Sequence, residues 1–300
     1  MRWLYHALTR DEWEGAAAHD SLSPASLDRE GFVHTSYRDV VASSARLYLP
    51  PDVPLRVLQI DPRRLVPRVD VAETPRGPMP HVHGPIAKDA IAKVWDVDSL
   101  VAAIASGAAP DRVQGTRFAF VAFEGMTLLD LVGAYDPLSR IATMGFDATS
   151  TCAIISATEG AWRHSEAIFR ADHVRPSLDP FDVVVVPGGH AARALCDDPR
   201  VTSWLATFPA NRLIASVCTG ALLLGAIGRL RGLRATTHRS ALDRLAAYGA
   251  TAVADRVVDE GQVVTAGGVT SALDLGMHLV TRLEGEEVAS RIADQMELRR

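Results

Sequence analysis

The chain has 300 residues, a length that predicts about two domains. Of these residues, 48% are hydrophobic and 22% are charged, which is typical of globular proteins. This composition excludes disordered and fibrous proteins. The net charge of −5 argues against a nucleic-acid partner. No apolar run reaches the roughly 18 residues of a membrane span, and the amino-terminal residues lack a signal-peptide pattern. We therefore expect no membrane association and a cytoplasmic location.

The first hundred residues predict a small α+β domain. Residues 11–19 and 38–48 have helical periodicity, whereas 55–60 and 90–97 have the short apolar pattern of strands. Pro-rich stretches separate these segments. We predict one domain over residues 1–104 and a linker over 105–116, where small and turn-forming residues dominate.

The rest of the chain, residues 117–300, predicts a second domain of the α/β class. Apolar strand patterns alternate with helical patterns, which favours a doubly wound parallel sheet covered on both faces. Ligands of such sheets lie at the carboxyl ends of the strands. The predicted strands are 117–123, 149–157, 181–186 and 212–218, and the predicted helices between and after them are 128–144, 191–196 and 219–228.

The segment around Cys218 is the strongest candidate for chemistry. An apolar strand ends at Cys218, and a helical pattern of small residues and leucines begins with Thr219 and Gly220. Such a turn projects the side chain out of the sheet, and the helix amino terminus favours thiolate over thiol. Gly220 lets the helix pack close to the strand. A buried structural cysteine is the alternative.

Other residues at predicted strand ends support a site at this turn. Gly188 and Gly189 follow a valine-rich strand, and their amides could form part of an oxyanion hole, although paired glycines also serve as plain turns. Asp130 lies near the start of an apolar helix, where a buried carboxyl is costly without a partner. We expect it to be either an acid/base group or a helix cap. His238 follows another predicted strand, and we expect it to be either a pocket residue or the first residue of a helix.

Residues 117–297 resemble the ThiJ/PfpI superfamily, which implies a flavodoxin-like fold. The resemblance rests on the segments VVVVPGG, ASVCTGALLLGAIGRLRG, ATTH and DRVVDEGQVVTAGGVTSALDLGMHLV. TLLDLVGAYDPL, together with Cys-Thr at the turn, is similar to the isonitrile hydratase branch, which adds water to R–N≡C and gives an N-substituted formamide. The resemblance implies Cys218 as the nucleophile, Asp130 as general acid/base and Thr219 as a hydrogen-bonding neighbour. It also implies a homodimer formed through this domain.

That chemistry is physically reasonable, because a thioimidate formed on Cys218 needs a proton and then water, and one carboxyl can serve both steps. Thr219 replaces the histidine of the peptidase-like branch, which argues against protease activity. The helix-turn-helix regulators need a DNA-binding module that the residues after the final helix cannot supply. Glyoxalase- or deglycase-like members usually carry Glu where Asp130 stands. A redox sensor with an oxidisable Cys218 is the non-enzymatic alternative.

The remaining cysteines and histidines of the second domain are weaker candidates. We expect Cys152 and Cys196 to be structural, and His190 to lie on the surface at a helix start. His164, His173 and His278 lack metal-ligand spacing. The three cysteines give no disulfide framework and no paired metal-ligand spacing. We expect no metal and no cofactor, and the resemblance implies a small-molecule substrate.

The first domain resembles a bacterial family of unknown function with an ADP-ribosyltransferase-like fold. Its marks are a Ser-Leu-x-x-Glu-Gly-Phe-x-His-x-Ser motif over 26–36 and a Pro-His-x-x-Gly-Pro motif over 80–85. The fold suggests NAD-holding roles for His6 and Glu73, which we do not favour, because fold alone does not give function. His34 and His81 are expected to hydrogen-bond the turns of a small domain. Zinc binding by His34, His81 and His83 is a weaker alternative.

Overall fold

The computed structural model describes all residues except 51, 76, 159–161, 165, 166, 170, 299 and 300. For residues 162–164 and 167–169 it describes the backbone but not the side chains. The chain divides into two compact units, Met1–Val113 and Gln114–Arg300. The first unit includes most of the predicted linker, because Val113 donates a backbone hydrogen bond to the Met1 carbonyl and the Arg2 guanidinium binds Asp111.

The amino-terminal unit is an α+β structure. Its two larger sheets, in the orders β1-β4-β8 and β3-β6-β5, are antiparallel, and β2 pairs with β7. The four predicted segments are present as α1, α3, β4 and β8, whereas α2, α4 and the other six strands of the unit were not predicted. The elements are β1 (Leu4–Thr9), α1 (Arg10–Ala16), β2 (Ser21–Leu22), α2 (Ala25–Glu30), β3 (Val33–His34), α3 (Val41–Tyr48), β4 (Leu55–Ile60), the 3-10 turn η1 (Pro62–Arg64), β5 (Val69–Thr74), β6 (Gly77–Val82), β7 (Ile86–Ala87), η2 (Lys88–Ala90), β8 (Ile91–Asp96) and α4 (Val97–Ala105).

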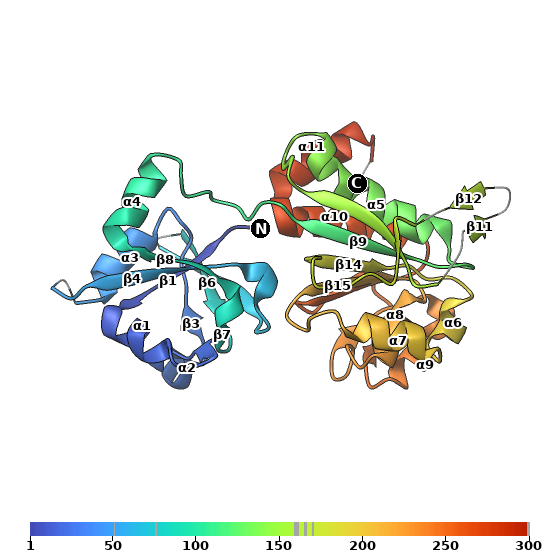
Figure 1. Ribbon diagram of the computed structural model, residues 1–300, viewed down its shortest axis with the longest axis horizontal. Helices are drawn as coiled ribbons and strands as arrows, with labels where there is room; N and C mark the ends of the chain where they lie inside the picture. Colours follow the sequence, from blue (N-terminus) through green and yellow to red (C-terminus); the bar gives the residue numbers. More distant parts are fainter. Residues whose placement is uncertain (51, 76, 159–161, 165–166, 170, 299–300) are drawn as a thin grey trace. The chain divides into compact units, whose positions relative to one another are not determined.

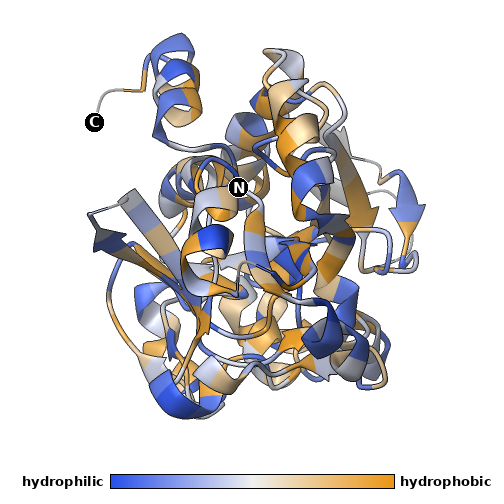
Figure 2. Cartoon of the chain, turned by 90° about the vertical axis from the view of Figure 1, so that its left-hand side faces the viewer, coloured by the Kyte–Doolittle hydropathy of each residue, from blue (hydrophilic) through white to orange (hydrophobic). Residues whose placement is uncertain are grey.

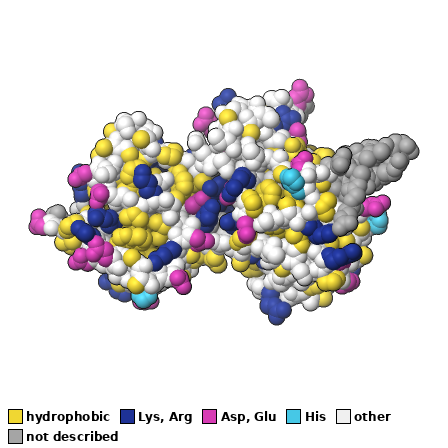
Figure 3. Space-filling model, in the orientation of Figure 1, with side chains coloured by type: hydrophobic (Ala, Val, Ile, Leu, Met, Phe, Trp, Pro, Cys, Tyr) yellow, Lys and Arg dark blue, Asp and Glu magenta, His cyan; other side chains and the backbone are white. Residues whose placement is uncertain are grey.

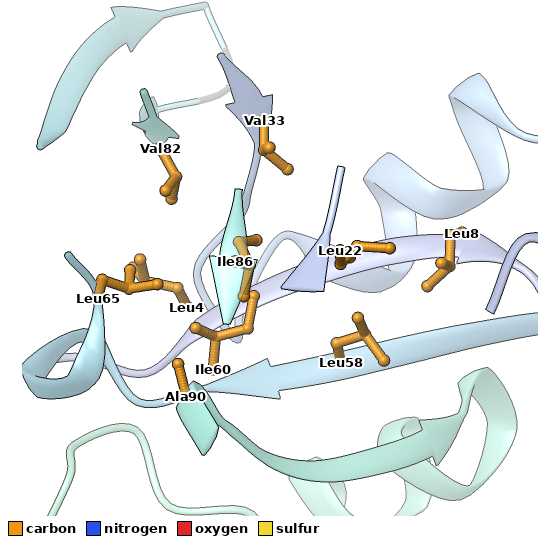
Figure 4. Packing of buried hydrophobic residues seen from close by; sticks show 10 residues of the cluster. All are labelled: Leu4, Leu8, Leu22, Val33, Leu58, Ile60, Leu65, Val82, Ile86 and Ala90. Atoms are coloured by element: carbon orange, nitrogen blue, oxygen red, sulfur yellow. The ribbon is translucent and has the colours of Figure 1, made fainter. Parts of the chain in front are cut away.

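Buried aliphatic side chains form a core of this unit (Figure 4). Leu58 and Ile60 of β4 pack with Leu4 and Leu8 of β1 and with Ile86 of β7. Alternate residues along a strand point to the same face, so Leu58 and Ile60, two positions apart in β4, both face this core. The chain therefore builds a hydrophobic core before residue 100, as expected of an independent domain.

The carboxy-terminal unit is built on a seven-stranded sheet in the order β13-β10-β9-β14-β15-β19-β18, parallel except for the edge strand β18. The strands of the unit are β9 (Arg117–Ala122), β10 (Thr151–Ser156), β11 (Trp162–His164), β12 (Ala167–Phe169), β13 (His173–Val174), β14 (Val183–Val186), β15 (Leu213–Val217), β16 (Arg234–Ala235), β17 (Thr251–Ala252), β18 (Val257–Asp259) and β19 (Val263–Ala266). Of these, β11 pairs with β12 and β16 pairs with β17 outside the seven-stranded sheet. The helices are α5 (Leu128–Thr143), α6 (Ala192–Leu195), α7 (Pro199–Ala206), α8 (Gly220–Ala226), η3 (Arg239–Ala241), α9 (Leu242–Ala246), α10 (Ser271–Glu284) and α11 (Glu286–Gln295).

Helices cover both faces of this sheet, which confirms the predicted α/β class. In Figure 1, α5, α10 and α11 lie on one side, and α6 to α9 lie on the other. Contacts of α5 with β9 and of α8 with β15 agree with that arrangement. Individual helices carry both hydrophobic and hydrophilic stretches (Figure 2), as amphipathic layers require.

Glycine allows helix α8 to pack against the central strands. A Cβ added to Gly220 would lie 2.3 Å from the Val186 carbonyl oxygen, so only glycine fits there. This agrees with the close packing predicted for the residue. The turn between β15 and α8 is thereby held at the carboxyl ends of the parallel strands, where ligands of such sheets bind.

The surface carries charges of both signs. On the face shown in Figure 3, basic and acidic side chains lie interspersed among other residues. Exposed pairs such as Arg10–Glu14 contribute little to stability individually. Among the described residues, no helix combines the length and apolarity that a bilayer span requires.

Candidate active site

Cys218 occupies a strained turn between β15 and α8. Its φ of +55° is in the left-handed region that non-glycine residues seldom adopt. Three groups hold the turn: the Cys218 amide donates to the carbonyls of Ala266 and Gly267, at 3.0 and 2.8 Å, and the Thr237 hydroxyl donates to the Cys218 carbonyl at 2.7 Å. Such fixed strain is typical of a nucleophile turn.

Asp130 lies beside this cysteine from the first turn of α5. Its side chain is fully buried, and Oδ2 accepts a hydrogen bond from the Gly188 amide at 3.0 Å. The Cys218 side chain interacts with the same carboxyl. Within the described part of the chain, Oδ1 has no hydrogen-bond partner of standard geometry. Sulfur, carboxyl and strand end thus meet as the sequence predicted, and one carboxyl oxygen is free to take part in proton transfer.

The amides of Gly188 and Gly189 have partners inside the protein. Gly188 donates to Asp130, and Gly189 donates to the Thr219 hydroxyl at 2.9 Å, which in turn donates to the Gly189 carbonyl at 2.8 Å. The expected oxyanion hole is therefore not preformed by free amides, because the buried carboxyl and hydroxyl need these donors. A Cβ on Gly188 would lie 2.5 Å from the Thr219 nitrogen, so this glycine permits the close approach.

The pKa values of the pair correct one prediction. Burial, followed by the nearby Asp130 charge, raises the pKa of the Cys218 thiol to about 11, and the hydrogen bonds from Thr219 only partly oppose this. The predicted preference for thiolate is therefore wrong for this structure. Burial also raises the pKa of Asp130 to about 6, against the lowering effects of the Gly188 amide and Cys218. At neutral pH the pair is mainly a thiol next to a carboxylate.

His238 directly precedes η3 and caps it. Its Nδ1 lies 2.8 Å from the Ser240 hydroxyl and accepts from the Ser240 amide at 3.3 Å. Its ring also lies against Gly268, where an added Cβ would be 3.3 Å from Cδ2. The histidine therefore caps a helical turn, as its alternative interpretation predicted, at the edge of the site.

The other cysteines lie apart from this arrangement. Burial raises the pKa of Cys152 to about 12. The Cys196 thiol contacts the Ala192 carbonyl at 3.1 Å, and burial raises its pKa as well. Among the described residues, neither thiol forms a hydrogen bond with a carboxyl, which fits a structural role.

The remaining histidines of this unit have separate surroundings. His190 is exposed after Gly189, and His173 is exposed in β13. His278 pairs with Asp259 at 2.7 Å. The side chain of His164 lies outside the described residues.

Three histidines of the amino-terminal unit lie close together, two on the sheet β3-β6-β5 and one directly after β6. His34 and His81 are directly paired across strands. The Phe32 ring stacks on His81 with a centroid distance of 3.9 Å, and His34 binds Glu30 at 2.9 Å. These contacts, rather than turn hydrogen bonds, hold the pair. His83 lies 3.2 Å from Asp70.

The two residues considered for NAD binding differ in their surroundings. His6 is buried, with Nδ1 at 2.7 Å from the His34 carbonyl, while Glu73 is exposed on β5. Across the described ranges, no group of three or more His, Cys, Asp or Glu side chains is placed to hold a metal ion.

Sequence reasoning missed the groups that hold the Cys218 backbone. Thr237 belongs to the ATTH segment but received no role, and the carbonyls of Ala266 and Gly267 carry no side-chain signal. These bonds join elements far apart in the sequence, so only the fold brings them together. The alternation of apolar strands indicates their common edge, but not which atoms meet there.

Comparisons with known proteins match each unit to a sequence family. Residues 116–282 match the DJ-1/PfpI family, which is more than half of the chain. This chain belongs to the DJ-1/PfpI family. Residues 7–94 match a protein family of unknown function, DUF952. The predicted superfamily and the predicted amino-terminal family of unknown function are thereby confirmed, whereas the ADP-ribosyltransferase-like fold stays a prediction.

Relatives within the DJ-1/PfpI family have different activities. Isonitrile hydratase of Pseudomonas putida is 33% identical over 183 residues, covering 60% of this chain and 78% of that protein. The glyoxalase DJR-1.2 of Caenorhabditis elegans is 31% identical and the match covers 36% of this chain and 58% of that protein. The regulator CdhR of Pseudomonas aeruginosa is 27% identical, and the match covers 61% of this chain and 55% of that protein.

A solved structure supports the fold directly. A ThiJ/PfpI family protein from Pseudomonas syringae superimposes with a TM-score of 0.56 and 28% identity, covering 63% of this chain and 77% of that chain. The match therefore extends over most of that protein. The flavodoxin-like α/β fold of this unit is confirmed.

Proposed function

We propose that the protein is a cysteine-dependent hydro-lyase that adds water to an isonitrile and forms an N-substituted formamide. The observation that carries the proposal is the buried Asp130 carboxyl beside the Cys218 thiol, with Oδ1 uncommitted among the described residues. The relative from Pseudomonas putida, named an isonitrile hydratase, supports the choice of substrate.

The first step uses Asp130 as a base. With a pKa of about 6, Asp130 is mostly ionised at neutral pH, whereas the Cys218 thiol is protonated. As Sγ bonds to the terminal isonitrile carbon, the carboxylate takes the thiol proton and delivers it to that carbon. The product is the thioimidate R–N=CH–S–Cys. A carboxyl that titrates near the working pH suits both halves of this transfer.

The second step uses the same carboxyl with water. Water adds to the thioimidate carbon while Asp130 accepts one of its protons and passes it to nitrogen. The C–S bond then breaks, the remaining hydroxyl proton returns to sulfur, and the formamide leaves. The Thr219 hydroxyl, bonded to both polar backbone groups of Gly189, fixes the adjoining loop during these steps.

The test is hydration of cyclohexyl isocyanide by the full chain, with N-cyclohexylformamide followed by NMR. Wild type should form the product, and Cys218→Ala should reduce kcat/KM by about a thousandfold or more. Cys196→Ala is the matched control and should retain activity. Failure of the wild type to form formamide, or turnover that persists in Cys218→Ala, would contradict the proposal.

Two alternatives give different results in the same preparation. A glyoxalase would release D-lactate from methylglyoxal. A redox sensor would show Cys218 oxidised by low peroxide without isonitrile turnover; the raised thiol pKa disfavours that reaction, because the thiolate is the form that peroxide oxidises.

A further inference from the structure

A small hollow adjoins the Cys218 turn on the side of β19 and η3. Its volume is about 180 Å³, enough for a group of a few heavy atoms. Two of its lining residues bind the Cys218 backbone. The Thr237 hydroxyl donates to the Cys218 carbonyl, and the Gly267 carbonyl accepts from the Cys218 amide. The hollow therefore shares a wall with the nucleophile turn, and the His238 ring lies beside it at Gly268.

The charged groups around this hollow are not equivalent. Arg256 donates to Asp274 at 2.8 Å, and Asp255 accepts from Arg234 at 3.0 Å, so these two lining residues are neutralised by ion pairs. Arg239 also lines the hollow and is exposed. In the part of the chain that the structure describes, it has neither a hydrogen-bond partner nor an ionic partner.

The polar groups of the wall suit an anion. The Thr237 hydroxyl is committed as a donor to Cys218, while the Arg239 guanidinium offers several unused donors in a planar fork. That fork matches the geometry of a carboxylate and binds it with two hydrogen bonds. A neutral group would gain no charge-assisted hydrogen bond from this guanidinium.

We propose that Arg239 binds a carboxylate of the substrate in this hollow, so that small isonitriles carrying an acidic group are the preferred substrate class. The inference rests on the proposed hydratase function. Arg239 thereby determines specificity, while the reaction at Cys218 and Asp130 is unchanged.

The kinetic test compares isocyanoacetate, 3-isocyanopropanoate and 4-isocyanobutanoate with their methyl esters, using the full chain. For the member of matching length, we expect the acid to have a kcat/KM about fivefold above its ester, the effect of one partly exposed charged contact. Arg239→Gln should remove this preference, mainly by raising the KM for the acid. Arg231→Gln removes an exposed arginine outside the hollow's lining and should keep the preference.

A second measurement does not depend on turnover. Butanoate should slow the alkylation of Cys218 by iodoacetamide more than butanamide does, and Arg239→Gln should abolish the difference. Peptide mapping distinguishes Cys218 from the other two cysteines. If no isonitrile is hydrated, the hydratase proposal fails, but this protection still tests the anion site. Equal protection by acid and amide, or an acid preference that survives Arg239→Gln, would overturn the inference about Arg239.

Discussion

The charge state of Asp130 governs the chemistry at the residue scale. Its carboxyl is buried against Cys218, and burial raises its pKa to about 6 from an ordinary value of 3.8. The same burial raises the pKa of the thiol to about 11. The pair therefore holds one proton over a wide pH range, on sulfur, with the carboxylate as its nearest acceptor.

This charge state predicts a pH profile. Below pH 6, protonation of Asp130 removes the base, so kcat/KM should fall about tenfold per pH unit. Between pH 7 and 9 the profile should be flat, because the thiol stays protonated. Steady-state hydration of cyclohexyl isocyanide measures this, and a rise in activity through pH 8 to 9, as a free thiolate would give, would contradict the assignment.

Asp130 also predicts a conflict between stability and activity. A carboxyl whose pKa is raised in the folded state contributes stability at low pH, and this contribution is lost as the pH rises through 6. Asp130→Asn should therefore abolish hydration, yet increase the free energy of unfolding at pH 8 by about 2 kcal/mol, with a smaller gain near pH 4. Urea unfolding at both pH values measures the effect.

The matched control is Asp198→Asn. The Arg200 guanidinium lowers the pKa of Asp198 to about 2, so its charge is favoured in the folded state. Removing that charge should give no stabilisation at pH 8. An equal gain in both variants would mean that the effect of Asp130→Asn does not come from its burial.

At the scale of elements, the close approach of α8 to the strands determines where the turn lies. A Cβ at position 220 would meet the Val186 and Pro187 carbonyl oxygens at 2.3 and 2.7 Å. Gly220→Ala should therefore move the helix and lower the free energy of unfolding by about 3 kcal/mol, with loss of hydration activity. Thermal unfolding and the isonitrile assay test both effects.

Gly15→Ala provides the comparison for this substitution. Gly15 lies within helix α1 with no neighbouring atom within 4 Å of an added Cβ. At this position alanine should increase the free energy of unfolding by up to about 1 kcal/mol, because alanine favours the helix more than glycine does. A similar small gain at Gly220 would show that close packing does not position the turn.

The predictability of these elements follows from how local their signals are. The strand and helix around Cys218 could be predicted from an apolar run followed by small residues and leucines. Asp130 was recognised because a carboxyl in an apolar helix is costly without a partner. The partner itself, the Gly188 amide, lies 58 positions away in the sequence, and the direction of the thiol pKa shift depends on burial by the whole fold. Such contacts have no local pattern.

At the scale of the whole molecule, the described catalytic candidates all lie in the unit Gln114–Arg300. The amino-terminal unit has its own hydrophobic core and belongs to a different sequence family. A chain of residues 114–300 should therefore fold and hydrate cyclohexyl isocyanide with a kcat/KM within about threefold of the full chain. Circular dichroism and the same assay test this. A folded but inactive fragment would mean that the amino-terminal unit contributes to the site.

The central claim is that Cys218 forms a covalent bond to the isonitrile carbon. Rapid acid quenching during turnover, followed by intact-mass measurement and peptide mapping, tests it most directly. We expect an added mass of one substrate molecule on the peptide containing Cys218, absent in Cys218→Ala. Formamide produced at full rate with no adduct on Cys218, or an adduct confined to Cys152 or Cys196, would contradict it.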